Sequence, residues 1–253
     1  MRLNYTFILI LTFVVNSFSQ EVIWVNDSTS TTSEMISKRS VSYDNYYYIA
    51  GDFKGDVSIG TKNFVSYGNK DIFISKQTSN GEYVKSIQIG SSAIDFFYDM
   101  KVDNNGDIYI VGAYKNDCDF NGTVLTSTGS FDGFIAKYDA DLNLIWAKRQ
   151  AYSSTLQFIT AIVIDNNNHL IIAGSFMDSL IVGNPATSDT LIEDQVKSLF
   201  LAKFDINGNI LDTVQFKTTA PQTAITNISV DNNNNYYLAG NYTGTISYFS
   251  NNK

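Results

Sequence analysis

The chain has 253 residues, of which 44% are hydrophobic and 17% charged, with two prolines; this composition excludes disorder and predicts a packed core. The formal net charge of −8, without a basic stripe, argues against nucleic acid and anionic membrane surfaces as partners. A single cysteine, Cys118, excludes an internal disulfide and a metal site built from cysteines.

The first residues resemble a secretory signal peptide. Arg2 supplies a positive start, residues 7–15 form a short apolar run, and residues 17–19 (SFS) offer small side chains for cleavage. The run is shorter than the roughly 20 residues of a membrane span, and no other stretch is apolar enough for one. We expect cleavage after residue 19 and a soluble, exported protein of residues 20–253, secreted or at the cell surface, without a transmembrane segment.

One phrase occurs four times in the remaining sequence. Its copies are YYIAGDF, IYIVGAY, LIIAGSF and YYLAGNY, whose glycines are Gly51, Gly112, Gly174 and Gly240, at intervals of 61, 62 and 66 residues. A second phrase, FISK, FIAK or FLAK, begins 22, 22 and 26 residues after the first three of these glycines. A period of this kind predicts a repeat array. We call the four glycines the marker glycines.

Each full repeat is predicted to contain four strands, named a to d. In the second copy they span 97–102, 107–114, 133–138 and 143–148, where β-branched and aromatic residues alternate with period two. The repeats are expected at about 36–88, 97–148, 159–216 and 224–253, the last ending after strands a and b. Segment 21–27 (EVIWVND) matches a strand d, because Trp24 precedes its marker glycine by 27 residues and Trp146 by 28.

Strand b is apolar on both faces. One face carries Ile108 and Ile110 in the second copy, and the other carries Val111, with equivalent residues in every repeat. A strand of this kind must be covered on both sides, and no amphipathic helix separates the copies. Neighbouring sheets must therefore cover it. We predict an all-β fold: an incomplete β-propeller of four-stranded antiparallel blades, with about three full blades and partial terminal blades.

The connections differ at the two ends of these strands. Short turns rich in Asn and Gly join a to b and c to d, as in tight hairpins. The b–c connections are long, at 54–70, 115–131 and 178–197, and they share the opposite end with the d–a connections. Long connections on a rigid scaffold commonly carry binding residues, so we expect a functional face at that end.

These motifs resemble the SBBP-type β-propeller repeat family of bacterial exported proteins. The resemblance rests on DNNGDIYIVG at 103–112, DGFIAK at 132–137 and Trp146. The first copy departs from it with Ser-Tyr-Asp at 42–44, and the third with Ser198 in place of an aspartate. The resemblance implies extracellular or surface propellers, often in long proteins with a C-terminal sorting domain. It implies no catalytic residue, so none is assigned.

Two clusters of oxygen-bearing side chains are weak calcium candidates. The first comprises Asp139, Asp141 and Asn143, and the second Asp205, Asn207 and Asn209. Neither continues to the glycine and distal glutamate of a calcium loop, and turn chemistry explains both clusters. We expect no metal and no cofactor, with calcium as the weaker alternative.

Several other residues receive structural interpretations. His169 is expected to be a solvated turn residue, and Cys118 a modestly exposed residue or, alternatively, an intermolecular thiol link. Trp24 and Trp146 are assigned to repeat packing, with a carbohydrate-stacking platform as the alternative. The recurring lysines are expected to lie on apolar surface with their ammonium groups outside, and two aspartates before strand c to be turn residues. These lysines are Lys76, Lys137 and Lys203, and the aspartates are Asp71 and Asp132.

The function expected from the sequence is a noncatalytic binding or scaffold module that presents its b–c and d–a loops to an extracellular protein or glycan. The alternatives are a polysaccharide-acting propeller enzyme with catalytic residues in missing blades, and an inert surface spacer. Strand a offers mainly Ile, Val, Met, Ser and Thr, which disfavours an enzyme. Since the predicted strands close no regular propeller, we expect further repeats of the same polypeptide, or a second chain, to complete it.

Overall fold

The computed structural model describes residues 33–183, 188–192, 197–219, 223–242 and 244–250. The predicted signal peptide and segment 21–27 with Trp24 lie outside these ranges. The elements within them are all β-strands, so the expected all-β class is confirmed. No helix in this part of the chain has the length and apolar character needed to cross a bilayer.

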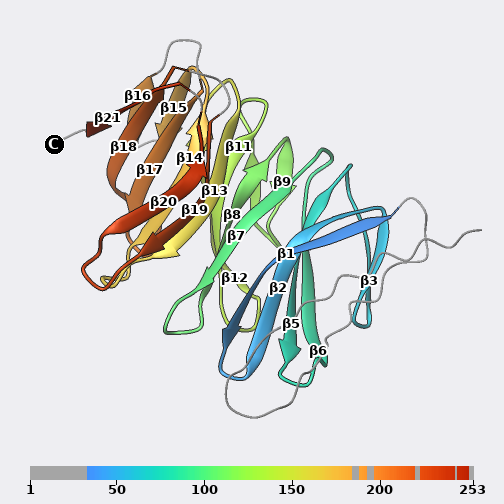
Figure 1. Ribbon diagram of the computed structural model, residues 1–253. Coiled ribbons are helices and arrows are strands. Elements are labelled where there is room, and N and C mark those ends of the chain that lie inside the picture. The colour runs from blue at the N-terminus through green and yellow to red at the C-terminus, as the bar shows by residue number, and fades with distance from the viewer. Residues whose placement is uncertain (1–32, 184–187, 193–196, 220–222, 243, 251–253) are drawn as a thin grey trace, which may run out of the picture.

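The first repeat forms one four-stranded antiparallel sheet (Figure 1). Its strands are β1 (Glu34–Tyr43), β2 (Tyr46–Lys54), β5 (Asp71–Thr78) and β6 (Tyr83–Ile89), hydrogen-bonded in the order β1-β2-β5-β6. They correspond to strands a to d. Between β2 and β5 the chain forms a hairpin of β3 (Asp56–Ile59) and β4 (Lys62–Val65).

The second and third repeats follow the same plan, and the predicted order of strands a to d is confirmed in both. The second contains β7 (Phe96–Val102), β8 (Ile108–Tyr114), β9 (Asp117–Asp119), β10 (Val124–Thr126), β11 (Asp132–Tyr138) and β12 (Leu144–Tyr152). The third contains β13 (Gln157–Ile164), β14 (Leu170–Phe176), β15 (Ser179–Val182), β16 (Asp189–Ile192), β17 (Ser198–Phe204) and β18 (Ile210–Thr218). The fourth contributes β19 (Ala224–Val230), β20 (Tyr236–Asn241) and β21 (Ile246–Ser250).

In the second, third and fourth repeats, strands of the b–c connection attach to the preceding repeat. Strand β15 pairs with β12 and β21 pairs with β18, which extends these two sheets to six and five strands. In the second repeat, Asp119 of β9 and Gly90 after β6 exchange two backbone hydrogen bonds of 3.0 and 3.3 Å. These strands therefore tie each of the three repeats to the outer edge of the one before it.

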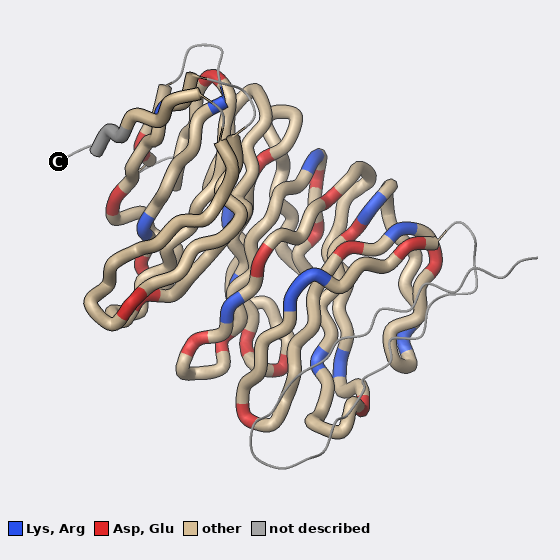
Figure 2. Tube along the Cα trace, in the orientation of Figure 1, with Lys and Arg blue, Asp and Glu red and all other residues tan. Residues whose placement is uncertain are grey.

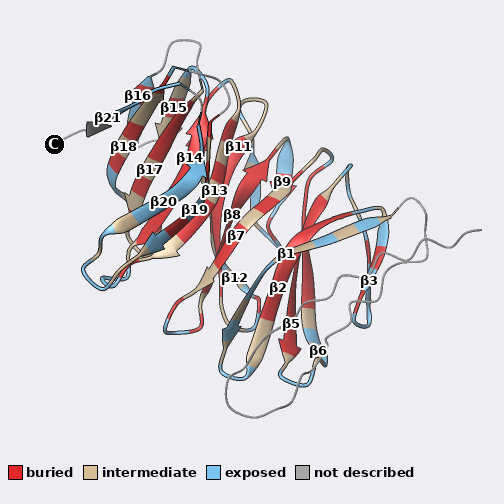
Figure 3. Cartoon of the chain, in the orientation of Figure 1, coloured by how far each residue is buried: buried red, intermediate tan, exposed pale blue. Residues whose placement is uncertain are grey.

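The sheets stack face to face, with strands β1, β7, β13 and β19 as neighbours along one side of the stack (Figure 1). Alternate residues of β8 enter different cores, because Ile110 packs toward the first sheet and Val111 toward the third. The prediction that neighbouring sheets cover both faces of strand b is thus confirmed for β8, and β14 likewise contributes to two cores. Burial is continuous through the middle of the stack (Figure 3).

The marker glycines are explained by a bulge in strand a. Each of these strands carries one extra residue, at Lys38, Tyr98, Thr160 and Thr226. In each repeat, the carbonyl oxygen of the residue two positions before the bulged residue lies against the marker glycine. A Cβ at Gly112 would lie only 2.0 Å from the Phe96 carbonyl oxygen. The same distance is 1.9 to 2.1 Å in the other repeats. Only glycine permits this approach.

We predict that Gly112→Ala lowers the free energy of unfolding by about 2–3 kcal/mol, because its Cβ would meet both the Phe96 oxygen and the Phe134 ring, 2.6 Å away. Gly240→Ala is the matched comparison, since the atoms nearest to its Cβ are backbone atoms of β19 and include no ring. We therefore expect Gly240→Ala to lower the free energy of unfolding by less. Urea unfolding of both variants measures the difference. An unchanged midpoint for Gly112→Ala would contradict the role given to the bulge.

Candidate functional site

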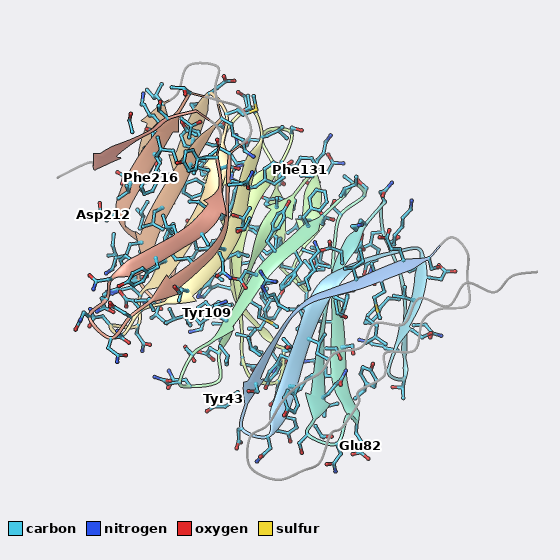
Figure 4. The ribbon with its side chains drawn as sticks, in the orientation of Figure 1. Tyr43, Glu82, Tyr109, Phe131, Asp212 and Phe216 are labelled. Carbon is cyan, nitrogen blue, oxygen red and sulfur yellow. The ribbon has the colours of Figure 1, made fainter. Side chains whose placement is uncertain are left out.

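Four half-buried aromatic rings form a continuous surface that we call the aromatic platform: Phe96, Tyr98, Phe131 and Phe158. The Phe96 ring lies 6.0 Å from Tyr98 and 5.5 Å from Phe131, and the Phe158 ring lies 6.2 Å from Tyr98 and 5.8 Å from Phe131. Each ring therefore touches two others in a closed circuit. Phe131 lies in a long b–c connection (Figure 4), and Phe96 and Phe158 lie at the beginnings of β7 and β13, directly after d–a connections. The platform is therefore at the end of the sheets that carries the long connections.

The platform is built by the second and third repeats together. Phe96 and Tyr98 belong to β7, Phe158 starts β13, and Phe131 precedes β11. The Phe131 carbonyl accepts a hydrogen bond of 3.2 Å from the Gln157 N–H, which fixes the two repeats to each other at this point. Tyr98 is the bulged residue of its strand, and bulges re-aim side chains.

The bulge position carries three different residue types in the four repeats, on the same bulged backbone. Lys38, Thr160 and Thr226 occupy it in the other repeats. Lys38 donates from Nζ to the Phe97 carbonyl at 2.9 Å, and Thr160 donates from Oγ1 to the Ile225 carbonyl at 2.5 Å. Both bonds reach the strand a of the next repeat. A variable residue on a constant, rigid frame is the arrangement expected of a recognition surface.

Two ammonium groups lie beside the platform. Lys38 Nζ is 5.5 Å from the centre of the Tyr98 ring, and Lys115 Nζ is 5.9 Å from the centre of the Phe131 ring. Both are within the range of cation–π attraction. The platform thus combines apolar ring faces with positive charge, in a chain whose net charge is negative.

Next to the platform, charged side chains converge among the inner strands; we call them the inner-strand charge cluster, comprising Lys38, Arg39, Asp52, Asp99 and Lys101. Arg39 Nε lies 3.0 Å and Lys101 Nζ 3.1 Å from the Asp99 carboxylate, and Lys38 forms an ion pair with Asp52. Charged segments of β1 and β7 lie side by side (Figure 2). Besides the Ile, Val, Met, Ser and Thr side chains expected there, strand a thus contributes charged side chains that pair with one another.

Both carboxylates of this cluster are engaged by backbone N–H groups as well. Asp52 accepts from Phe97 at 2.8 Å, and Asp99 accepts from Ile162 at 3.1 Å. Burial raises the pKa of Asp52, and Lys38 opposes that rise. Burial and the nearby Asp52 raise the pKa of Tyr98 to about 12, so its hydroxyl stays protonated at neutral pH. These contacts join the inner parts of neighbouring sheets.

In both clusters of calcium candidates, the first aspartate accepts hydrogen bonds within its own turn. The Asp139 carboxylate accepts hydrogen bonds from the N–H groups of Asp141 and Asn143 and from the Asn143 amide. Asp205 accepts the equivalent three bonds from Asn207 and Asn209. Partial burial raises the pKa of Asp139, but these bonds outweigh it and hold the pKa below its usual range. Among the described residues, no group of three or more His, Cys, Asp or Glu gathers as a metal site would require.

The recurring lysines lie differently from the prediction. Lys76 is buried, with its Nζ 2.7 Å from the Asp141 carboxylate and 4.1 Å from the centre of the Tyr46 ring. Lys137 pairs with Asp107 at 2.7 Å, and Lys203 pairs with Asp165 at 3.1 Å. The expectation of ammonium groups outside is wrong, because each charge is held against a carboxylate of a hairpin turn.

Three further residues are structural. His169 is only partly exposed, and its Nδ1 lies 3.1 Å from the Asp165 carboxylate. Cys118 is fully buried in β9, and burial raises the pKa of its thiol, so the expectation of modest exposure is wrong. Trp146 packs edge-on against Tyr109 at 6.2 Å in the core between the second and third sheets, as the packing interpretation expected.

Sequence reasoning missed a set of buried carboxylates. Asp71 and Asp132 begin strands β5 and β11 and are fully buried, contrary to the prediction of turn residues. Each accepts a hydrogen bond from the N–H four residues earlier, at 2.9 Å from Tyr67 and 2.8 Å from Thr128. Burial raises the pKa of both. The four-residue spacing to a preceding loop is a signal that could have identified them.

No protein-family model matches the chain. The chain is 29% identical over 168 residues to an uncharacterized WD repeat-containing protein of Acanthamoeba polyphaga mimivirus. The similarity covers 61% of this chain and 12% of the length of that protein. The relative is thus a much longer repeat protein, and the similarity is to one portion of it.

Proposed function

We propose that the chain is an exported, noncatalytic β-propeller module that binds an extracellular partner on its aromatic platform. The observation that carries this proposal is the circuit of four half-buried rings at the end with the long connections, with two ammonium groups beside it. Because the four rings are only half-buried, part of each remains accessible to a ligand.

The propeller assignment rests on the way the repeats pack. Strands a lie next to one another along the stack, β8 and β14 are covered on both faces by other sheets, and the order a to d recurs in three repeats. WD repeats form the four-stranded blades of propellers, so similarity to a WD repeat protein supports the same architecture. The SBBP-type motifs agree with this assignment.

The chemistry of the platform favours an acidic glycan as the partner. Aromatic faces stack on the apolar faces of sugar rings, and the nearby ammonium groups would attract carboxylates of uronic acids. The Lys115 ammonium is the better placed for this, because Lys38 is already paired with Asp52.

A panel of polysaccharides tests the proposal, with uronate-containing and neutral polymers measured by calorimetry for binding and by a reducing-end assay for turnover. We expect binding of the acidic polymers without turnover, about tenfold weakening by Phe131→Ala, and weaker binding with less salt dependence in Lys115→Gln. Tyr67→Ala is the control, since this ring is 63% exposed and its side chain makes no ring contact with the platform.

Different outcomes separate the alternatives. Turnover of any polymer would overturn the noncatalytic assignment. Glycan binding that Phe131→Ala leaves unchanged would place the site elsewhere on the molecule. If no polymer binds but a cell-surface protein binds and Phe131→Ala weakens that binding, the platform is the binding surface and the proposed glycan partner is wrong.

A further inference from the structure

Strand β20 exposes apolar side chains that are buried at the same positions in the other repeats (Figure 3). Leu238 is 38% exposed and Tyr242 is 60% exposed, whereas their equivalents Ile110 and Tyr114 in the second repeat are fully buried. Among the described residues, β20 is paired only with β19. The contrast arises from the surroundings and not from the sequence of the strand, which keeps the repeat pattern.

The exposed face forms one wall of an apolar groove of about 310 Å³. Leu199 and Phe216 of the third sheet, Ile225 of β19 and Ile246 of β21 also line it. The groove runs beside the marker glycine of the fourth repeat.

In the other repeats, a phenylalanine of strand c occupies this place. Phe134 is directly opposite Gly112 in the register of β8 and β11, and Phe200 is opposite Gly174 in β14 and β17. A Cβ on either glycine would meet the ring at 2.6 or 2.7 Å, so each ring lies directly over its glycine. The ring also packs against the aromatic residue two positions after the glycine, with centroids 6.2 Å apart for Tyr114 and Phe134.

A lysine three residues after this phenylalanine completes the pattern. Lys203 follows Phe200 at that spacing and pairs with Asp165 in the a–b turn of its repeat at 3.1 Å. Asp231 holds the same turn position in the fourth repeat, where its carboxylate accepts bonds from Asn235 and Tyr237 and lies exposed. Gly240, Tyr242 and Asp231 thus correspond to the three residues that strand c of the third repeat contacts, Gly174, Phe176 and Asp165. The lysines of the first two repeats pair with Asp141 and Asp107 instead.

We propose that the free edge of β20 is a receptor for a β-strand of the form Phe-(Ile/Leu)-(Ser/Ala)-Lys from a further copy of this repeat. The strand adds its backbone to the edge of β20, seats its phenylalanine over Gly240 against Tyr242, and brings its lysine to Asp231. This interaction is separate from the aromatic platform, which lies between the second and third repeats.

A synthetic peptide of residues 130–152, labelled with a fluorophore, probes the edge, because it contains the complete strands β11 and β12. We expect saturable binding to the chain by fluorescence anisotropy, and at least tenfold weaker binding of the same peptide with Phe134→Ala. Leu238→Glu in the protein should abolish binding. Val65→Glu is the matched control, since Val65 is an exposed apolar residue of β4 at 62%, outside the groove.

Four outcomes would overturn the proposal. The first two are that the parent peptide does not bind, or that the Phe134→Ala peptide binds equally well. The third is that Leu238→Glu and Val65→Glu weaken peptide binding equally. The fourth is that the chain self-associates without peptide and Leu238→Glu removes this association. The last would make a second copy of the folded chain the occupant. Increased protection of the β20 amides from hydrogen exchange on peptide addition would support pairing at this edge.

Discussion

Replacing Asp99 with alanine is expected to lower the free energy of unfolding by roughly 3 kcal/mol or more. The Asp99 carboxylate, in β7, is 2% exposed. It pairs with Arg39 of β1 and accepts a hydrogen bond from the Ile162 N–H of β13, so it joins three inner strands. It also accepts the Met100 N–H at 2.9 Å. Its removal leaves buried N–H groups without an acceptor and two cations without a counter-charge. Urea unfolding measures the loss.

Two further variants identify which contacts dominate. Asp99→Asn keeps one oxygen acceptor and removes the charge, so we expect it to lose clearly less stability than Asp99→Ala. Arg39→Met removes a partner whose side chain is 40% exposed and should cost below about 1 kcal/mol. Equal losses for Arg39→Met and Asp99→Ala would show that the ion pair, and not the backbone N–H groups, carries the effect.

The regular part of this fold could be predicted because its causes are local. The alternation of strand b and the Asp-rich turns depend on neighbouring residues, and the structure has both where the sequence indicates them. The marker glycines were recognised from their spacing, but their cause, a bulge in the adjacent strand, is a pairing between segments about 15 residues apart. Sequence spacing reveals such a requirement without explaining it.

The hairpins of the b–c connections were missed for a similar reason. Strand β9 has three residues and β15 four, too short for alternation to be recognised. They form because an outer strand of the preceding sheet supplies an edge with which they pair. The stability of these strands therefore depends on contacts between repeats, which a single repeat sequence does not display.

The candidate site was predictable only as a location. The end with the long connections was identified, but the platform rings come from three separate segments, and Tyr98 faces them only because the bulge shifts its direction. Buried carboxylates such as Asp132 resemble turn residues in sequence, since aspartate is common in turns. Their burial follows from the adjoining loop, which supplies the N–H donors.

Asp95 is expected to make the stability of the chain fall between about pH 4 and pH 7. The residue is fully buried, and burial raises its pKa from 3.8 to about 7, although hydrogen bonds from Ser91 and Lys115 oppose the rise. Asp71 adds to the rise, and the nearby Cys118 and Tyr114 are neutral at these pH values because burial raises their pKa as well.

The sign follows from proton binding. Between pH 3.8 and about 7 the folded chain holds a proton on Asp95 that the unfolded chain has released, so raising the pH favours unfolding. The interval from 3.8 to about 7 corresponds to at most roughly 4 kcal/mol, lost in full above pH 7. Asp95→Asn should therefore be more stable than the parent at pH 8, with a much smaller difference at pH 4.

The third repeat provides the reciprocal variant. Gln157 occupies the equivalent position, is fully buried, and accepts the Ser153 N–H at 3.2 Å as Asp95 accepts the Ser91 N–H at 2.6 Å. Gln157→Glu should introduce a second loss of stability toward high pH, and Asp95→Asn should remove the first. Urea midpoints across pH 4 to 8 for the parent and both variants measure this. Parallel curves of urea midpoint against pH for the three proteins would contradict a protonated Asp95. The variants would then change stability equally at every pH, as a change in packing alone does.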